Sequence, residues 1–202
     1  MENLKVIPTG QALGAEIFGL DLTRPLSRPS INGLRQALLD YSLIFFRNQS
    51  LSEQNQVNFT RYFGKPVEHV RKQLDRPIKE IFLISNIKKE GKAIGALSND
   101  EIGFHSDLSY LPQPGTISTL YAVQLPKNKG ATQWCNGYSS YEALDNSTKE
   151  RIQRLKAVHR HSLEEQNPDK PAAHPLACTH PETGRKTLYL GCLLYTSDAA
   201  DE

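Results

Sequence analysis

The peptide FHSDLSY sets a histidine and an aspartate two residues apart, at His105 and Asp107. Its composition predicts a strand over residues 104–110, and alternate residues of a strand face the same side of a sheet. We therefore expect the imidazole and the carboxylate to converge on one point. Such a pair would supply two ligands of the two-His-one-carboxylate site of non-haem Fe(II) oxygenases. A structural histidine beside a surface aspartate is the alternative, because a pair of this kind often arises by chance.

Helices are predicted mainly towards the amino-terminal half of the chain. One covers residues 31–41, where leucines recur at helical spacing. Two others are expected to begin at capping boxes, formed by Ser50 with Glu53 and by Ser147 with Glu150. In a capping box, the serine hydroxyl and the glutamate three residues later satisfy backbone N–H groups that have no partner within the helix.

Strands are predicted in short runs that are rich in aromatic and β-branched residues and bounded by Pro, Gly, Asn or Asp. These runs cover residues 43–47, 81–85, 104–110, 116–125, 132–136, 157–162, 175–179 and 186–190. The turn from Pro181 to Gly184 predicts that the last two runs pair as a hairpin. Many short strands with flanking helices favour an α+β fold, a jelly roll covered by helices.

Composition limits the classes of partner. The 202 residues carry 24 Lys and Arg against 22 Asp and Glu, and the interspersed net charge of +2 argues against nucleic acid as a partner. The apolar run at residues 43–46 is too short to cross a membrane, and the amino terminus lacks the features of a secretory signal, so we expect a cytoplasmic protein. Three cysteines without a C-x-x-C pair argue against disulfides and structural zinc. The sequence leaves open whether the chain forms a homo-oligomer.

Five segments together resemble the taurine and 2,4-dichlorophenoxyacetate dioxygenase (TauD/TfdA) family. They are GAEIFGLDLTRPLS, LIFFRNQSLS, FHSDLSY, KGATQWCNGYSSYEAL and HPLACTHPETGRKTLYLG, and they extend from about Gly14 to Gly191. The resemblance implies a jelly-roll (double-stranded β-helix, clavaminate-synthase-like) core. It also implies an enzyme that uses Fe(II), 2-oxoglutarate and O2 to hydroxylate a small organic acid, with release of succinate and CO2.

The same resemblance implies roles for individual residues. His105 and Asp107 fall on the first two iron ligands of the family and would therefore be catalytic. Thr132 falls on the threonine whose hydroxyl helps to hold the distal carboxylate of 2-oxoglutarate; a strand threonine with no such role is the alternative. His69, Asn86, Glu101 and Ser109 are candidates for substrate contacts. For His69 and Asn86, a surface loop histidine and a turn-forming asparagine are the competing interpretations.

The family pattern breaks near the carboxyl end. The family completes its site with a distal histidine and then an arginine that pairs with 2-oxoglutarate, whereas here Gly191 is followed by CLLYTSDAADE. We expect residues 1–191 to be the amino-terminal portion of a dioxygenase domain, residues 192–202 to be a non-native tail, and the chain alone to be inactive. The alternatives are a non-catalytic jelly roll that binds a metal or small acid, and a cupin-like hydrolase or isomerase that uses a second pair, His159 and His161.

Overall fold

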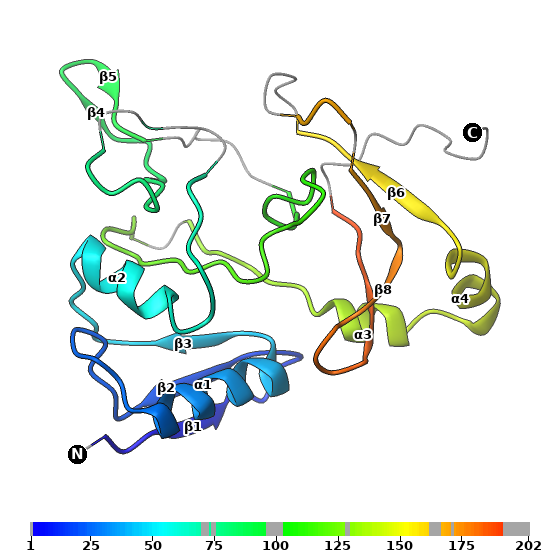
Figure 1. Cartoon of the computed structure of the whole chain (residues 1–202), viewed down its shortest axis with the longest axis horizontal. Coiled ribbons are helices and arrows are strands. Elements are labelled where there is room, and N and C mark those ends of the chain that lie inside the picture. Colours follow the sequence, from blue (N-terminus) through cyan, green and yellow to red (C-terminus); the bar gives the residue numbers. More distant parts are fainter. Residues whose placement is uncertain are drawn as a thin grey trace.

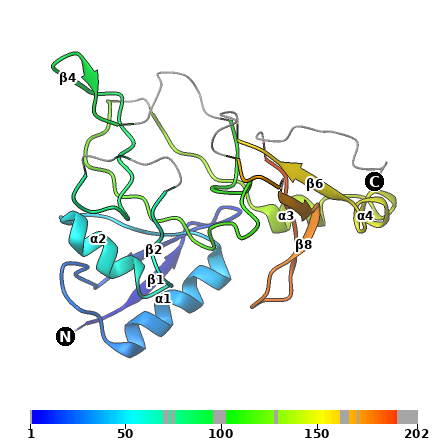
Figure 2. The same ribbon diagram turned by 45° about the horizontal axis from the view of Figure 1, so that its top comes forward.

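A computed structural model describes residues 2–69, 73, 76–95, 103–127, 130–161, 167–170 and 172–191. Its elements form two groups, which Figure 1 shows on opposite sides of the molecule. The amino-terminal group contains β1 to β3 with α1 and α2, and the carboxy-terminal group contains α3, α4 and β6 to β9. Largely irregular chain, described over residues 103–127 and 130–135, connects one group to the other, as the turned view in Figure 2 also shows.

The amino-terminal group is a three-stranded sheet covered by helices. Strand β2 (Ala15–Phe18) pairs antiparallel with β1 (Lys5–Pro8) and parallel with β3 (Ile44–Phe46). Helix α1 (Arg28–Tyr41) makes the crossover between the two parallel strands, and α2 (Glu53–Thr60) follows β3. Their apolar faces enclose the main core, whose buried members are Ile17, Leu20, Leu22, Leu26, Leu34, Ala37 and Phe59.

Three helices form near the predicted positions, but two begin at different caps. Helix α1 starts three residues earlier than predicted, behind the Ser27 cap. Helix α2 is capped by Ser52 with Asn55, and α4 (Asn146–Ile152) is capped by Asp145, so the predicted boxes at Ser50 and Ser147 are wrong. The carboxylate of Asp145 accepts from the Ser147 hydroxyl and the Thr148 N–H, and these hydrogen bonds hold the pKa of Asp145 well below its usual range. A carboxylate accepts hydrogen bonds more strongly than a serine hydroxyl does, so α4 is capped by Asp145 rather than by Ser147.

The carboxy-terminal group consists of two hairpins and two short helices. Strand β6 (Lys156–His159) pairs antiparallel with β7 (Ala172–Pro175), and β8 (Ala177–Thr179) pairs antiparallel with β9 (Lys186–Leu188). The predicted hairpin turn from Pro181 to Gly184 is therefore confirmed. Helix α3 (Gly137–Glu142) precedes α4, and a small hairpin of β4 (Lys88–Lys89) and β5 (Lys92–Ala93) lies with the first group.

Several predicted strands are absent from the described part of the chain. Residues 81–85, 116–125 and 132–136 are irregular, and residues 107–110 form turns, so these predictions are wrong. A strand needs a neighbour to accept its backbone hydrogen bonds. Segment 116–125 instead lies against α2 through side chains: the Tyr121 hydroxyl accepts from Leu51 N–H, and Gln56 donates to the carbonyl of Thr119. The described strands make four small sheets rather than a closed jelly roll.

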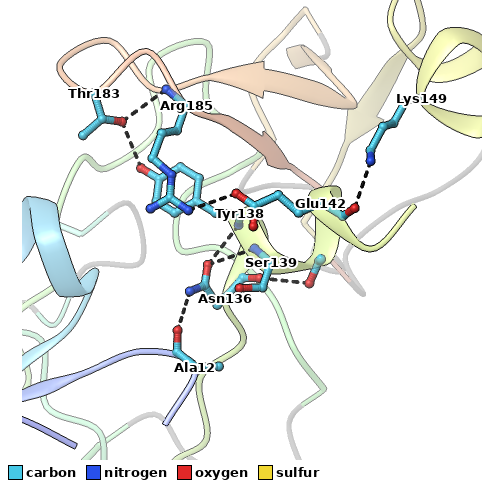
Figure 3. A network of polar contacts seen from close by, with 9 residues as sticks. Ala12, Asn136, Tyr138, Ser139, Glu142, Lys149, Thr183 and Arg185 are labelled. Atoms are coloured by element: carbon cyan, nitrogen blue, oxygen red, sulfur yellow. Dashed lines mark hydrogen bonds and ion pairs between the residues drawn. The ribbon is translucent and has the colours of Figure 1, made fainter. Parts of the chain in front are cut away.

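Among the described elements, the sequence did not predict helix α3 or the strands β1, β2, β4, β5 and β7, apart from Pro175 at the end of β7. Each of them is six residues or shorter, so its sequence pattern is weak. Helix α3 is held to the last hairpin by the polar network in Figure 3. The Arg185 guanidinium lies 4.0 Å from the centre of the Tyr138 ring and contacts Glu142 at 3.1 Å. Asn136, the cap of α3, donates to the Ala12 carbonyl and so links the two groups of elements.

No helix in the part of the chain that the structure describes is both long and apolar enough to cross a membrane.

Gly137 marks the closest approach of α3 to β9. A methyl group at this position would meet the Thr187 hydroxyl and lie 3.1 Å from the Leu188 carbonyl. We expect Gly137→Ala to lower the free energy of unfolding by about 1–3 kcal/mol, because overpacking must separate the helix from the hairpin. Denaturant unfolding measures this change. Gly64→Ala is the matched control, since nothing lies within 4 Å of its added carbon; equal effects of the two variants would contradict the packing argument.

Candidate metal-binding site

His105 and Asp107 meet on a turn rather than on a strand. The Nε2 atom of His105 lies 3.2 Å from Oδ1 of Asp107. Residues 107–110 form consecutive turns, and Leu108 has a left-handed backbone with a φ of 56°. The predicted strand is wrong, yet the expected convergence of the two side chains is present, because the turn brings the carboxylate back towards the imidazole.

Each of the two side chains is oriented by a hydrogen bond to its other polar atom. Nδ1 of His105 lies 2.9 Å from the carbonyl oxygen of Gly103. A carbonyl can only accept, so Nδ1 carries a hydrogen, and in the neutral ring Nε2 then holds a free lone pair. Oδ2 of Asp107 accepts from the Ser118 hydroxyl at 2.5 Å. The atoms left to bind a cation, Nε2 and Oδ1, are the two that face each other.

This geometry would allow the two side chains to hold one divalent cation. Nε2 and Oδ1 lie 3.2 Å apart, close enough for a single ion to contact both, and a neutral imidazole with a carboxylate suits Fe(II). The side chains are 34% and 53% exposed, so the open side faces solvent. Among the described residues, no group of three or more His, Cys, Asp or Glu is placed to hold a metal. The structure therefore provides a pair of ligands with an open face.

The remaining predicted residues are spread over the molecule. Thr132 is exposed and lies in irregular backbone, not on a strand beside the pair. The ring of His69 stacks on Phe82 with centres 4.1 Å apart, and Asn86 lies shortly before β4. Ser109 belongs to the turn itself and is 2% exposed. Glu101 lies outside the described residues. The roles of these residues towards 2-oxoglutarate or substrate stay predictions.

A ring cluster of His159, His174 and Tyr189 packs against the turn through His174. His159, at the end of β6, and His174, on β7, lie diagonally across the paired strands, with ring centres 5.3 Å apart. Tyr189, just after β9, packs 5.2 Å from His159 and 5.7 Å from His174. His159 is 2% exposed, and its Nε2 has no hydrogen-bond partner. Burial, and secondarily the neighbouring His174, lowers the pKa of His159.

His159 and His161 do not converge on a shared point. His159 packs within the ring cluster, whereas the His161 ring lies edge-on to Tyr110, with centres 5.1 Å apart. Within the described ranges no third metal-ligating side chain joins them. A metal site of the cupin kind, one of the alternatives raised from the sequence, therefore has no support in this region.

Sequence reasoning did not assign roles to Ser118, His174 and Tyr189. Ser118 contacts Asp107 across eleven residues, and the His174 Nε2 lies 2.9 Å from the carbonyl oxygen of Ser109 across 65 residues. A side-chain hydrogen bond also joins Tyr189 to Ser106. Of these three contacts, only that of Ser118 has a trace in the local sequence, where Ser118 is a polar residue in the strand-like segment 116–125. The other two contacts depend on tertiary structure and leave no sequence pattern.

Removing the Ser118 hydroxyl tests the orientation of the carboxylate. We expect Ser118→Ala to weaken divalent metal binding about 10- to 100-fold, the usual cost of losing a group that orients a ligand. Titration with Co(II), followed by visible absorption, measures the affinity. Ser140→Ala is the matched control, because its hydroxyl donates to Asn136 in α3, away from the turn. An affinity in Ser118→Ala equal to that of the control would contradict the role of the hydrogen bond.

The buried imidazole predicts acid sensitivity of the fold. An unfolded histidine takes up a proton near its ordinary pKa of 6.5, but folded His159 does so only at lower pH. The unfolded state therefore binds more protons between these values, and stability falls as the pH drops through this window. Replacing His159 by Phe removes this dependence, so thermal unfolding of His159→Phe should lose less stability than wild type between about pH 7.5 and about pH 5.5. If both proteins lost the same stability over this pH range, the acid sensitivity would not come from His159.

The chain was compared with known proteins by family, sequence and structure. The family described as "Taurine catabolism dioxygenase TauD, TfdA family" matches residues 5–200. An alkylsulfatase of Acinetobacter baylyi is 29% identical over 199 residues, covering 89% of this chain and 60% of its own length. The alpha-ketoglutarate-dependent 2,4-dichlorophenoxyacetate dioxygenase of Cupriavidus pinatubonensis is 27% identical over 206 residues, covering 91% of this chain and 72% of its own.

Solved structures show the same similarity. A taurine dioxygenase from Burkholderia xenovorans superposes with a TM-score of 0.79 at 33% identity, over 96% of this chain and 66% of that one. The structure of AAD-2 in complex with Mn(II) and N-oxalylglycine superposes with a TM-score of 0.76 at 25% identity, over 95% of this chain and 72% of that one. The chain thus spans between 60% and 72% of the length of these four proteins.

Proposed function

We propose, since this chain belongs to the taurine catabolism dioxygenase TauD, TfdA family, that its protein is an Fe(II)- and 2-oxoglutarate-dependent dioxygenase that hydroxylates a small organic acid. The relatives named above include enzymes that depend on alpha-ketoglutarate and act on small organic compounds. We also propose that the small sheets belong to a jelly-roll core with flanking helices, the fold of TauD-like dioxygenases.

The facing pair of His105 and Asp107 carries this proposal. A neutral imidazole nitrogen and a carboxylate oxygen, 3.2 Å apart, form the mixed donor set that suits Fe(II). Gly103 and Ser118 hold the other polar atom of each side chain, so the two metal-binding atoms are left facing each other. The structural relative AAD-2 was solved with Mn(II) and N-oxalylglycine, which supports a divalent metal and an oxalyl-bearing acid as ligands of this fold.

The proposed roles follow from the chemistry of each side chain. His105 and Asp107 would hold the iron, and Thr132 would donate a hydrogen bond to the distal carboxylate of 2-oxoglutarate. When bound, Fe(II) with 2-oxoglutarate and O2 supplies the oxidation, and succinate and CO2 are released. His69, Asn86, Glu101 and Ser109 remain the candidates for positioning the substrate. Of these, Ser109 is buried within the turn that carries Asp107.

Several further expectations stay predictions. They are the division into a domain of residues 1–191 and a tail of residues 192–202, the cytoplasmic location, the absence of nucleic acid and membrane partners, and the oligomeric state. A small-molecule substrate agrees with the relatives, among them a sulfate ester dioxygenase of Pseudomonas putida.

Loss of either proposed iron ligand should abolish turnover. We expect His105→Ala and Asp107→Ala to eliminate Fe(II)-dependent formation of succinate from 2-oxoglutarate, because each removes a bond to the metal. Thr132→Val should mainly raise the KM for 2-oxoglutarate, since a hydrogen bond to a charged group contributes about 1.5–3 kcal/mol. The assay is made on the native gene product, including whatever the gene encodes after residue 191.

Matched controls separate this outcome from misfolding. His180, in the hairpin turn between β8 and β9, and Asp40, near the end of α1, are changed to Ala in parallel. Both control proteins should retain turnover. Succinate formation at the wild-type rate in either His105→Ala or Asp107→Ala would exclude the proposed iron site, and formation that does not require Fe(II) would exclude the proposed reaction.

A further inference from the structure

We infer that His174 is a positioning residue, which holds the turn that carries His105 and Asp107 in its metal-binding geometry. This inference rests on the proposed function, since it assigns a role towards the same metal pair. His174 lies on β7, about seventy residues from the pair along the sequence, and does not itself face the metal position. Its effect would pass through the backbone of residues 106–111.

The contact between His174 and the turn is direct. Nε2 of His174 lies 2.9 Å from the carbonyl oxygen of Ser109 and 3.1 Å from that of Leu111. Because both partners can only accept, Nε2 must carry a hydrogen that the two carbonyls share. The two contacts lie two and four residues after Asp107, on either side of Tyr110.

The turn needs support from outside itself. Leu108 adopts the left-handed region, which costs a branched L-residue roughly 1–2 kcal/mol. Within the turn, the backbone offers only the bond from Ser109 N–H to Ser106 at 3.3 Å and the bond from Leu111 N–H to Leu108 at 3.0 Å. Because the carboxylate of Asp107 lies beside this strained residue, a small relaxation of the turn would change the 3.2 Å separation from His105.

His174 can act as a rigid support because its own ring is fixed. It lies opposite Ala157 in the β6–β7 pair, where a methyl group leaves room for the imidazole. The rings of His159 and Tyr189 pack against it edge-on, with centres 5.3 and 5.7 Å away. The hydrogen on Nε2 is therefore presented from a paired strand, which is the kind of element that holds a functional group accurately.

A second contact from the same cluster reaches the other end of the turn. Tyr189 shares a side-chain hydrogen bond with Ser106. Two residues later, the chain passes so close that a Cβ on Gly191 would lie 3.1 Å from Cα of His105. The ring cluster thus contacts the turn both before and after Asp107, and His174 supplies the contacts on the later side.

The test uses three replacements at His174. In Gln, the amide nitrogen is the same number of bonds from Cβ as Nε2 of histidine, so His174→Gln keeps a donor within reach. His174→Asn places the nitrogen one bond short, and His174→Leu has no donor. His180→Leu is the matched control, because the Nδ1 of His180 accepts from Glu182 and Thr183 in its own hairpin turn and its ring packs edge-on to Tyr138 in α3.

The first measurement is hydrogen exchange in the metal-free chain. We expect the amides of Ser109 and Leu111 to exchange about tenfold faster in His174→Leu and His174→Asn, the ratio that corresponds to one net hydrogen bond. His174→Gln and His180→Leu should exchange as wild type does. Unchanged exchange in His174→Leu and His174→Asn, or equal acceleration in His174→Gln, would overturn the hydrogen-bond role. If His174→Leu does not fold, the comparison of Gln with Asn decides.

The second measurement is Co(II) binding, followed through the visible spectrum, which depends on ligand geometry. His174→Leu and His174→Asn should bind about 10- to 100-fold more weakly than wild type, with an altered spectrum, and His174→Gln should restore both properties. Wild-type affinity in a variant whose turn has loosened would overturn the positioning role and leave the proposed function standing. Absence of Co(II) binding in the native gene product would overturn the metal pair itself, and the positioning role with it.

Discussion

The short separation between His105 and Asp107 is the constraint on which the candidate site depends. Two atoms that both bind cations must stay 3.2 Å apart on a turn that includes a left-handed leucine. Such a turn has little local stability of its own: two backbone hydrogen bonds lie within it, and its other contacts come from distant residues. Ser118 orients the carboxylate and His174 holds the following carbonyls, so the geometry of two ligands is set by several distant residues.

These supports come from both groups of elements, which explains why the irregular middle of the chain is positioned at all. Segment 116–125, which carries Ser118, is fixed to the amino-terminal group through Tyr121 and Gln56. The contacts of His174 and Tyr189 come from the carboxy-terminal hairpins. The turn lies where these two sets of contacts meet. Metal affinity should therefore respond to changes in either group, because preorganisation of the ligands is a tertiary property of the chain.

The sequence predicted features that depend on local chemistry and missed those that depend on partners. The helix over residues 31–41 and the turn before Gly184 were predicted because periodicity and turn residues act over a few positions. Residues 104–110, 116–125 and 132–136 have the composition of strands, but β-propensity describes a residue that fits a pleated surface and does not provide a neighbouring strand. The pairing of His105 with Asp107 was predicted from spacing, although a turn rather than a strand produces it. The contacts of Ser118 and His174 join residues too distant for any local pattern to indicate.

The three histidines near the site have different tasks. His105 must present a lone pair to bind a metal, since metal ligands of this type are neutral. His159 is buried without a partner for Nε2, so a charge there would be costly and its pKa is lowered by burial. His174 packs against His159, with ring centres 5.3 Å apart, while it holds the turn. A proton taken up by His159 would therefore disturb the ring cluster, which packs against the His174 ring that holds the turn. Replacing His159 with a ring that does not titrate would remove this disturbance and leave the contacts of His174 with the turn in place.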